Sequence, residues 1–210
     1  MNSSGSAEKQ SASLNPVHID GITYFAATDL AAVLKIGDGD VPKKFRSAID
    51  SMPYRICKSF EIESGHMLSK HPDKCAFPHG HTRKVEFVLE ADELDEREMV
   101  CDFKIIKQIM SDFLGTLDHA MCINTDDCRY ADFKAFYGDR VIGFEATDPT
   151  TEMMAKTIFD QFKERLSQYA NAPAQRYPLR NTLRIVKVRL WETSTSWAEY
   201  WEPQNESANL

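Results

Sequence analysis

Residues 54–63 read YRICKSFEIE, a run in which the side chains alternate along the chain. Ile56, Phe60 and Ile62 fall on one side of an extended backbone, and the acidic side chains fall on the other. A period of two is typical of a β-strand with one buried face. Residues 81–91 repeat the pattern. The two runs therefore predict a pair of strands that share one core-facing side.

Two helical patterns follow these strands. Asp102 suits an N-cap, and the apolar residues after it recur at helical spacing as far as Leu117. Residues 149–151, Pro-Thr-Thr, suit the start of a second helix, whose apolar residues recur as far as Leu166. Each helix is expected to bury one stripe of side chains.

The order of the elements predicts the fold class. Residues 183–191 and 196–201 have the character of two strands joined by a short turn, so a hairpin is expected there. Residues 120–145 show weak periodicity and are predicted to be mostly loop. The resulting order is ββααββ. We expect an α+β domain with an antiparallel sheet of four main strands and two helices on one face.

The chain is predicted to hold one such domain at residues 54–203, between an N-terminal extension at residues 1–53 and a polar tail at residues 204–210. The extension is too small to bury a core of its own. It is expected to contain a flexible tail at residues 1–15, a hairpin around Asp20-Gly21 and a short helix that starts at Thr28.

Composition narrows the class of protein. The 210 residues carry a formal net charge of −7, which disfavours non-specific binding to nucleic acid. No apolar run approaches the roughly 18 residues that span a bilayer, and the N-terminus lacks the apolar core of a signal peptide. The expected location is the cytoplasm, where the five cysteines act as core or functional thiols and form no disulfide framework.

Residues 75–81 read CAFPHGH, and His66 precedes them. In a strand, His79 and His81 would lie on the same face, a spacing that suits two bonds to one metal ion. With His66 they form a set of three nitrogens, which recurs in catalytic zinc sites with the fourth position open. Cys75 has two possible roles. It is either a catalytic thiol beside the metal or a fourth ligand that closes a structural zinc site.

Taken together, six short segments resemble the family of 6-pyruvoyl-tetrahydropterin and 6-carboxy-tetrahydropterin synthases, which have the tunnelling fold. They occur in the family's order over residues 56–202. The segments are Glu63-Ser64-Gly65-His66, Cys75 to His81, Val100-Cys101-Asp102-Phe103, Leu117-Asp118-His119, Pro149-Thr150-Thr151-Glu152 and Trp191-Glu192-Thr193. The chain departs from the family's pattern at Ser64-Gly65, at Phe77-Pro78 and in residues 1–53.

This resemblance implies a role for each matching residue. It makes His66, His79 and His81 the zinc ligands and Cys75 the catalytic thiol, with Asp118 and His119 as its proton-transfer partners. It places Thr150, Thr151 and Glu152 along the pterin pocket, and makes Glu192 the carboxylate that anchors the pterin ring. A carboxylate suits that ring because it accepts two parallel N–H donors at once.

The implied substrate is 7,8-dihydroneopterin triphosphate. The spacing of Cys75 and His79 resembles the bacterial 6-carboxy branch, whose product is 6-carboxy-5,6,7,8-tetrahydropterin, with acetaldehyde and triphosphate released, in queuosine and deazapurine biosynthesis. The alternatives are the 6-pyruvoyl reaction on the same substrate and a non-catalytic zinc- or pterin-binding module. Lys70, Lys74 and Arg83 are candidates for holding the triphosphate.

The resemblance also implies an assembly. An open antiparallel sheet has unpaired edges, and the family closes them by joining the sheets of several subunits into a barrel, as trimers that stack into hexamers. We therefore expect a homohexamer built as a dimer of trimers, with active sites between subunits. The expected partners are the pterin substrate and copies of the same chain, without nucleic acid or membrane.

Overall fold

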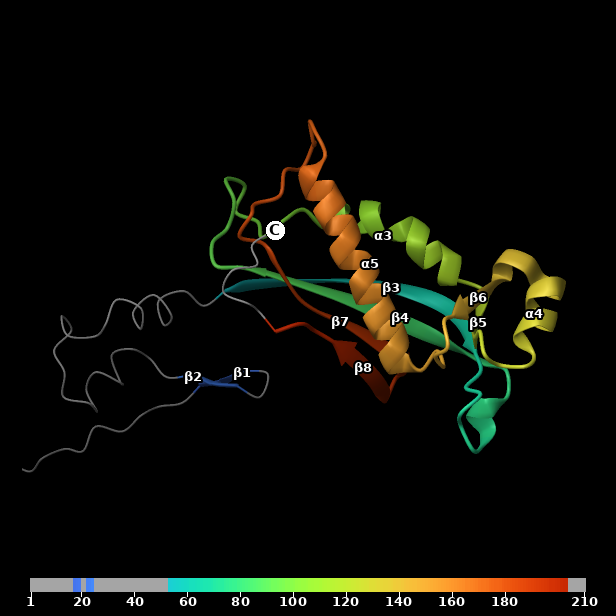
Figure 1. The fold of residues 1–210 in the computed structure, drawn as a ribbon. Helices are drawn as coiled ribbons and strands as arrows, with labels where there is room; N and C mark the ends of the chain where they lie inside the picture. The colour runs from blue at the N-terminus through green and yellow to red at the C-terminus, as the bar shows by residue number, and fades with distance from the viewer. Residues whose placement is uncertain (1–16, 20–21, 25–52, 204–210) are drawn as a thin grey trace, which may run out of the picture. The chain divides into compact units, whose positions relative to one another are not determined.

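The computed structural model describes residues 17–19, 22–24 and 53–203 (Figure 1). The chain forms two compact units, Met1–Met52 and Pro53–Leu210. In the first unit, β1 (Val17–Ile19) and β2 (Ile22–Tyr24) pair in antiparallel fashion. The turn at Asp20-Gly21, the helix predicted from Thr28 and both predicted tails lie outside the described residues.

The second unit is organised by a six-stranded sheet with the order β6-β5-β3-β4-β7-β8. Four neighbouring strands are antiparallel to one another, which confirms the predicted four-stranded core. They are β3 (Tyr54–His66), β4 (His79–Ala91), β7 (Arg184–Thr193) and β8 (Ser196–Tyr200). β5 (Ala120–Asn124) and β6 (Val141–Phe144) extend the sheet beyond β3 as parallel strands.

Two long helices lie on one face of this sheet, as the sequence predicts (Figure 1). α3 (Phe103–Leu117) begins where the Asp102 side chain accepts a hydrogen bond from the backbone N–H of Lys104 at 2.8 Å. α5 (Thr151–Asn171) begins where Thr150 Oγ1 accepts one from the backbone N–H of Met153 at 3.3 Å. In the parts of the chain that the structure describes, no helix has both the length and the apolar character needed to cross a membrane.

The core lies between the sheet and these two helices. The sheet contributes a layer of buried side chains to this core, because alternation along β3 and β4 turns them to the side of the helices. They are Ile62, Val85, Phe87 and Leu89. Phe87 packs against Phe162 of α5, with ring centroids 4.7 Å apart. Burial of such apolar surface is the main stabilising term, and aromatic pairs bury the largest areas per residue.

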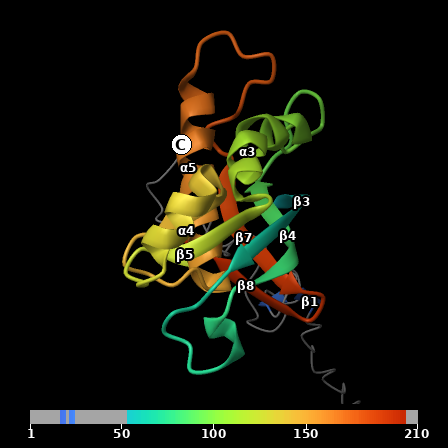
Figure 2. The same cartoon turned by 90° about the vertical axis from the view of Figure 1, so that its right-hand side faces the viewer.

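Residues 120–145 are not mostly loop, so that prediction is wrong. They form β5, the helix α4 (Tyr130–Tyr137), the short 3-10 helix η2 (Gly138–Arg140) and β6. β5 reads AMCIN and is largely buried, and a parallel strand buried on both faces shows no alternation. α4 has no fully buried residue, and its apolar contact is limited to Tyr130 and Phe133, which pack partly buried against a small cluster of Met67, Ile123 and Val141. Figure 2 shows α4 beside β5, at the edge of the domain.

Replacing Phe162 by Ala should lower the free energy of unfolding by about 3–5 kcal/mol, because it leaves a cavity against Phe87. Phe136→Ala is the control, since that ring is 82% exposed on α4 and its loss should cost under about 0.5 kcal/mol. Urea unfolding of both variants measures the difference. Equal losses would show that the core between the sheet and α5 is not where the structure places it.

Candidate metal centre and active site

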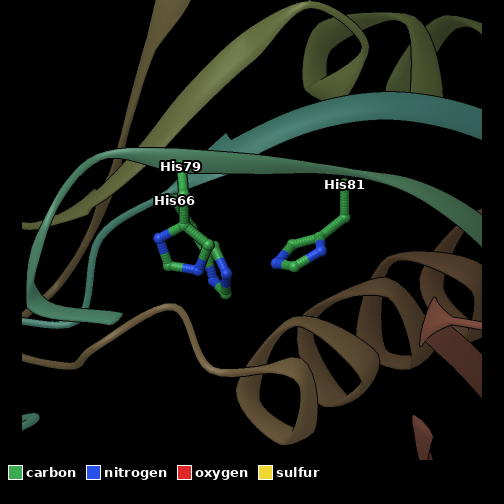
Figure 3. Close-up of side chains that lie close together, drawn as sticks. All are labelled: His66, His79 and His81. Atoms are coloured by element: carbon green, nitrogen blue, oxygen red, sulfur yellow. The ribbon is translucent and has the colours of Figure 1, made fainter. Parts of the chain in front are cut away.

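Three histidines gather where β3 ends and β4 begins. The two strands are in register from Tyr54 opposite Ala91 to His66 opposite His79, and His81 lies opposite Ser64. Alternation then turns all three rings to the helical face, and Figure 3 shows them projecting from the same side of the strand pair. One ligand atom from each ring lies within 4.8 Å of the others. The three histidines could therefore hold one metal ion.

Hydrogen bonds orient two of the rings. His66 Nδ1 lies 2.8 Å from the carbonyl oxygen of Pro149, and His79 Nδ1 lies 2.7 Å from that of Phe77. Because a carbonyl oxygen only accepts, each Nδ1 carries the proton and each Nε2 presents its lone pair. At His66 this lone pair faces Arg83 Nη2, which lies 3.2 Å from Nε2. His81 Nε2 is buried without a hydrogen-bond partner among the described residues. Three imidazole nitrogens, one of them otherwise unsatisfied, fit a divalent metal that prefers nitrogen ligands.

The surroundings keep the rings of His66 and His81 neutral. Burial, together with a smaller effect of the nearby Arg83 charge, lowers the pKa of His66 to about 4, although its hydrogen bond to Pro149 opposes the shift. Burial also lowers the pKa of His81, again with Arg83 adding to the effect. A histidine must be neutral to bind a metal, so the site is prepared for a ligand role near neutral pH.

A buried ion pair adjoins the histidines. Arg83 is fully buried, and its Nη1 donates to Thr151 Oγ1 at 3.2 Å while its Nη2 lies 3.4 Å from Glu192 Oε1. Thr151 donates to the same Oε1 at 2.9 Å. Burial alone would raise the pKa of Glu192, but the Thr151 hydrogen bond and the Arg83 charge lower it. Glu192 is therefore kept ionised. Its Oε1 makes all of these contacts, and its Oε2 makes none of them.

The position of Arg83 is a feature that sequence reasoning missed. The sequence makes Arg83 a candidate for holding the triphosphate. In the structure its guanidinium is fully buried and faces Glu192, so it is poorly placed for that role. The sequence contains a signal for this position. Arg83 follows His81 by two residues in a strand, so its side chain lies on the same face as the His81 ring. Lys70 and Lys74 remain exposed, although Lys70 Nζ contacts the carbonyl oxygen of Ala146 at 3.3 Å.

Cys75 lies in the connection between β3 and β4, within the short 3-10 helix η1 (Lys74–Ala76), and is half-buried. Its carbonyl oxygen accepts a hydrogen bond from the N–H of Leu68 at 2.8 Å, which ties the two sides of the loop together. Among the described residues, the group of close potential ligands consists of the three histidines and does not include Cys75. The structure therefore does not place Cys75 among the close candidate ligands of the metal.

Thr150, Thr151 and Glu152 mark the start of α5, but only part of this segment faces the centre. Thr150 is the N-cap, Thr151 is buried against Glu192, and Glu152 is exposed. The structure therefore connects Thr151 to the histidine cluster directly, through Glu192 and Arg83.

Asp118 and His119 form a pair between α3 and β5. His119 Nδ1 lies 2.9 Å from Asp118 Oδ2, and Asp118 Oδ1 accepts the backbone N–H of Glu63 at 2.8 Å. The bond from Glu63, followed by that from His119, lowers the pKa of Asp118, so the pair presents an ionised carboxylate to the imidazole. Both side chains are exposed, and His119 has a φ of 56°.

A cavity of about 600 Å³ lies beside this pair. His119 lines it together with Gly65, Gly80 and Thr82, and the strand positions Ser64 and His81 also border it. Alternation along β3 and β4 turns the two glycines and Thr82 away from the histidine rings, because Gly65 is next to His66 and Gly80 lies between the two ligands of β4. In one chain, the Asp118-His119 pair and the candidate metal centre thus lie on opposite faces of the sheet.

Comparison with known proteins gives a consistent picture. The family model described as 6-pyruvoyl tetrahydropterin synthase matches residues 55–203. A relative named 6-carboxy-5,6,7,8-tetrahydropterin synthase from Aquifex aeolicus is 32% identical in an alignment that covers 72% of this chain and 99% of the relative. One of the same name from Haemophilus influenzae is 29% identical in an alignment that covers 71% of this chain and 99% of the relative.

Solved structures share the fold. An uncharacterized protein from Wolinella succinogenes aligns with a TM-score of 0.57 at 21% identity, covering 72% of this chain and 99% of that one. The 6-pyruvoyl tetrahydropterin synthase of Plasmodium vivax aligns with a TM-score of 0.51 at 14% identity, covering 71% and 97%. The α+β fold of the prediction is therefore confirmed as the tunnelling fold.

The shifted pKa of His66 predicts a pH dependence of stability in the metal-free protein. The unfolded chain binds a proton at this histidine below its usual pKa of 6.5, whereas the folded chain binds it only near pH 4. Stability should therefore be complete above pH 6.5 and fall by about 3 kcal/mol as the pH drops from 6.5 to 4. Urea unfolding in the presence of a chelator measures this slope.

His66→Asn should remove most of that slope, while His71→Gln should leave it, because the His71 ring is exposed and accepts only from the N–H of Asp73. An unchanged slope in His66→Asn would show that His66 is not the group responsible.

Proposed function

The chain belongs to the 6-pyruvoyl tetrahydropterin synthase family of enzymes, and we propose that it converts 7,8-dihydroneopterin triphosphate to 6-carboxy-5,6,7,8-tetrahydropterin, with release of acetaldehyde and triphosphate. The observation that carries the choice of product is the 32% identity to a 6-carboxy-5,6,7,8-tetrahydropterin synthase along nearly its whole length. The proposed setting is queuosine and deazapurine biosynthesis in the cytoplasm.

The proposed metal is zinc, held by His66, His79 and His81. Bound there, zinc would act as a Lewis acid that makes the side-chain hydroxyls of the substrate more acidic. The protein contributes the neutral state of the rings, through burial of His66 and His81, and their orientation, through the carbonyl oxygens of Pro149 and Phe77. The open side of a three-histidine site is where the substrate would lie.

Glu192 is proposed to bind the pterin ring. Thr151 and Arg83 hold its Oε1, so the carboxylate has a fixed orientation and keeps Oε2 for the N–H donors of the ring. Fixing a carboxylate in advance reduces the entropy that binding would otherwise cost. Thr151 and Arg83 thus act on the pterin through Glu192, and the Thr150 cap holds the start of the helix that carries Thr151.

Cys75 is proposed to move a proton at a carbon atom of the substrate side chain, acting as its thiolate. The Asp118-His119 pair is its proposed partner. Because this pair lies on the other face of the sheet from the histidines, one chain does not bring the two sets together. We propose that a neighbouring subunit supplies Asp118 and His119 to each site.

An assembly of this kind also accounts for the edges of the sheet. β6 and β8 are its outer strands, and an unpaired strand edge is a surface that favours pairing with another chain. We propose a barrel of joined sheets in a hexamer, as a dimer of trimers. Two alternatives remain to be tested against this proposal, namely the 6-pyruvoyl reaction and a non-catalytic zinc- or pterin-binding module.

Incubation of the zinc-loaded protein with 7,8-dihydroneopterin triphosphate should give 6-carboxy-5,6,7,8-tetrahydropterin and acetaldehyde in equal amounts. Mass spectrometry of the pterin and a coupled assay for acetaldehyde measure both. A 6-pyruvoyl product without acetaldehyde would favour the first alternative, because only the 6-carboxy reaction breaks a carbon–carbon bond of the side chain.

Cys75→Ala serves as the matched control in that experiment. It should keep its zinc and lose turnover by roughly 10²-fold or more, since it removes the proton-transfer group and leaves the histidines. Loss of zinc in this variant would indicate a structural site with a cysteine ligand. Retained turnover would contradict the proposed role of Cys75.

A site shared between subunits predicts complementation. Cys75→Ala and His119→Ala should each be inactive, but hexamers assembled from an equal mixture should recover up to about a quarter of the wild-type activity, because some sites then receive both intact residues. Unfolding and refolding the two variants together, followed by an activity assay, measures this. No recovery, despite mixed hexamers detected by mass, would place both residues of a site in one chain.

A further inference from the structure

Asp148 is a buried carboxylate in the connection between β6 and α5, with 6% of its surface exposed. Its Oδ1 accepts hydrogen bonds from Ser69 Oγ at 2.6 Å and from Asn124 Nδ2 at 2.8 Å. Its Oδ2 accepts the backbone N–H of Lys70 at 2.7 Å. Burial alone would raise the pKa of Asp148, but these three hydrogen bonds lower it, so the group stays ionised.

Two of these donors belong to the loop that carries Cys75. Ser69 and Lys70 stand near the start of the loop at residues 67–78, and Leu68 donates to the carbonyl oxygen of Cys75 at 2.8 Å. Lys70 makes a second contact with the β6–α5 connection through its Nζ. The position of Cys75 therefore depends on residues 68–70, and Asp148 accepts hydrogen bonds from both Ser69 and Lys70.

The same connection touches the candidate metal centre. Pro149 follows Asp148 directly, and its carbonyl oxygen is the partner of His66 Nδ1. The Thr150 N–H donates to the carbonyl oxygen of Asp148 at 2.8 Å, and Thr151 then binds Glu192. The Asp148 side chain thus joins the loop that carries Cys75 to the segment that contacts His66 and Glu192.

We propose that Asp148 is a positioning residue that fixes the Cys75 loop against the metal centre through Ser69 and Lys70. The effect on turnover rests on the function proposed above, whereas the fixing of the loop does not. The carboxylate is matched to its site, because the three hydrogen bonds that its oxygens make with the described residues all come from donors. An amide would present its NH₂ group to at least one of those donors.

The test uses Asp148→Asn in the full-length protein. Hydrogen exchange at the Lys70 amide should accelerate about tenfold or more, since its acceptor is lost. Alkylation of Cys75 by iodoacetamide, quantified by peptide mass spectrometry to separate it from the exposed Cys57 and Cys128, should accelerate several-fold. In turnover, kcat should fall about tenfold while KM changes less than about twofold, because Glu192 is untouched.

Asp127→Asn is the matched control. Asp127 is 7% exposed and also accepts one backbone and two side-chain hydrogen bonds, all from Arg129. These hydrogen bonds stay within residues 127–129 and do not reach the loop, so Asp127→Asn should lower the stability while leaving the Lys70 and Cys75 readouts at wild-type values. If Asp148→Asn fails to fold, Ser69→Ala removes one of the same hydrogen bonds and should raise the Cys75 alkylation rate in the same direction.

The outcomes separate the two proposals. Equal acceleration at Lys70 and Cys75 in both aspartate variants, or none in Asp148→Asn, would overturn the positioning role and attribute any loss to general destabilisation. Faster hydrogen exchange at Lys70 and faster alkylation of Cys75 that occur only in Asp148→Asn support the positioning role. If the wild-type protein then fails to turn over 7,8-dihydroneopterin triphosphate, the proposed function falls while the fixing of the loop stands.

Discussion

The pairing of β3 with β4 is the constraint on which the rest of the domain depends. Thirteen residue pairs run from Tyr54 and Ala91 to His66 and His79 without a register shift. Because side chains alternate, a slip of one residue would turn the core-facing side chains of a strand toward solvent. It would also move the candidate ligands of the two strands to different faces. The same register therefore fixes the hydrophobic core at one end of the strands and the histidine cluster at the other.

The site also depends on a balance of buried charge. Arg83 would be costly to bury alone, and Glu192 beside it supplies the opposite charge. Thr151 stabilises the same carboxylate oxygen, so the ion pair has a fixed geometry. Burial and the nearby Arg83 guanidinium lower the pKa of His66 and His81, so both rings remain neutral. A group of residues that looks highly charged in sequence thus keeps two of the three candidate metal ligands, His66 and His81, neutral.

Local patterns were enough to predict much of this structure. Alternation located β3 and β4, and the His-x-His spacing brought two rings to one face. The capping residue Asp102 and the run Pro149-Thr150-Thr151 located the two helix starts. β5 and β6 escaped prediction because a short strand buried in a parallel sheet lacks a period, and its partners lie far along the chain. The roles of Arg83 and Asp148 depend on partners up to 109 residues away, which no local pattern encodes.

The glycines at positions 65 and 80 have a consequence for how this end of the sheet is packed. They lie opposite each other in the β3–β4 pair and line the cavity beside His119, and a Cβ at Gly65 would meet the Met121 side chain at 2.8 Å. The absence of a side chain at position 65 thus leaves room for the Met121 methyl group beside the strand that carries His66. A larger residue at position 65 would have to displace that methyl group, so the lining of the cavity and the end of β3 are built to fit each other.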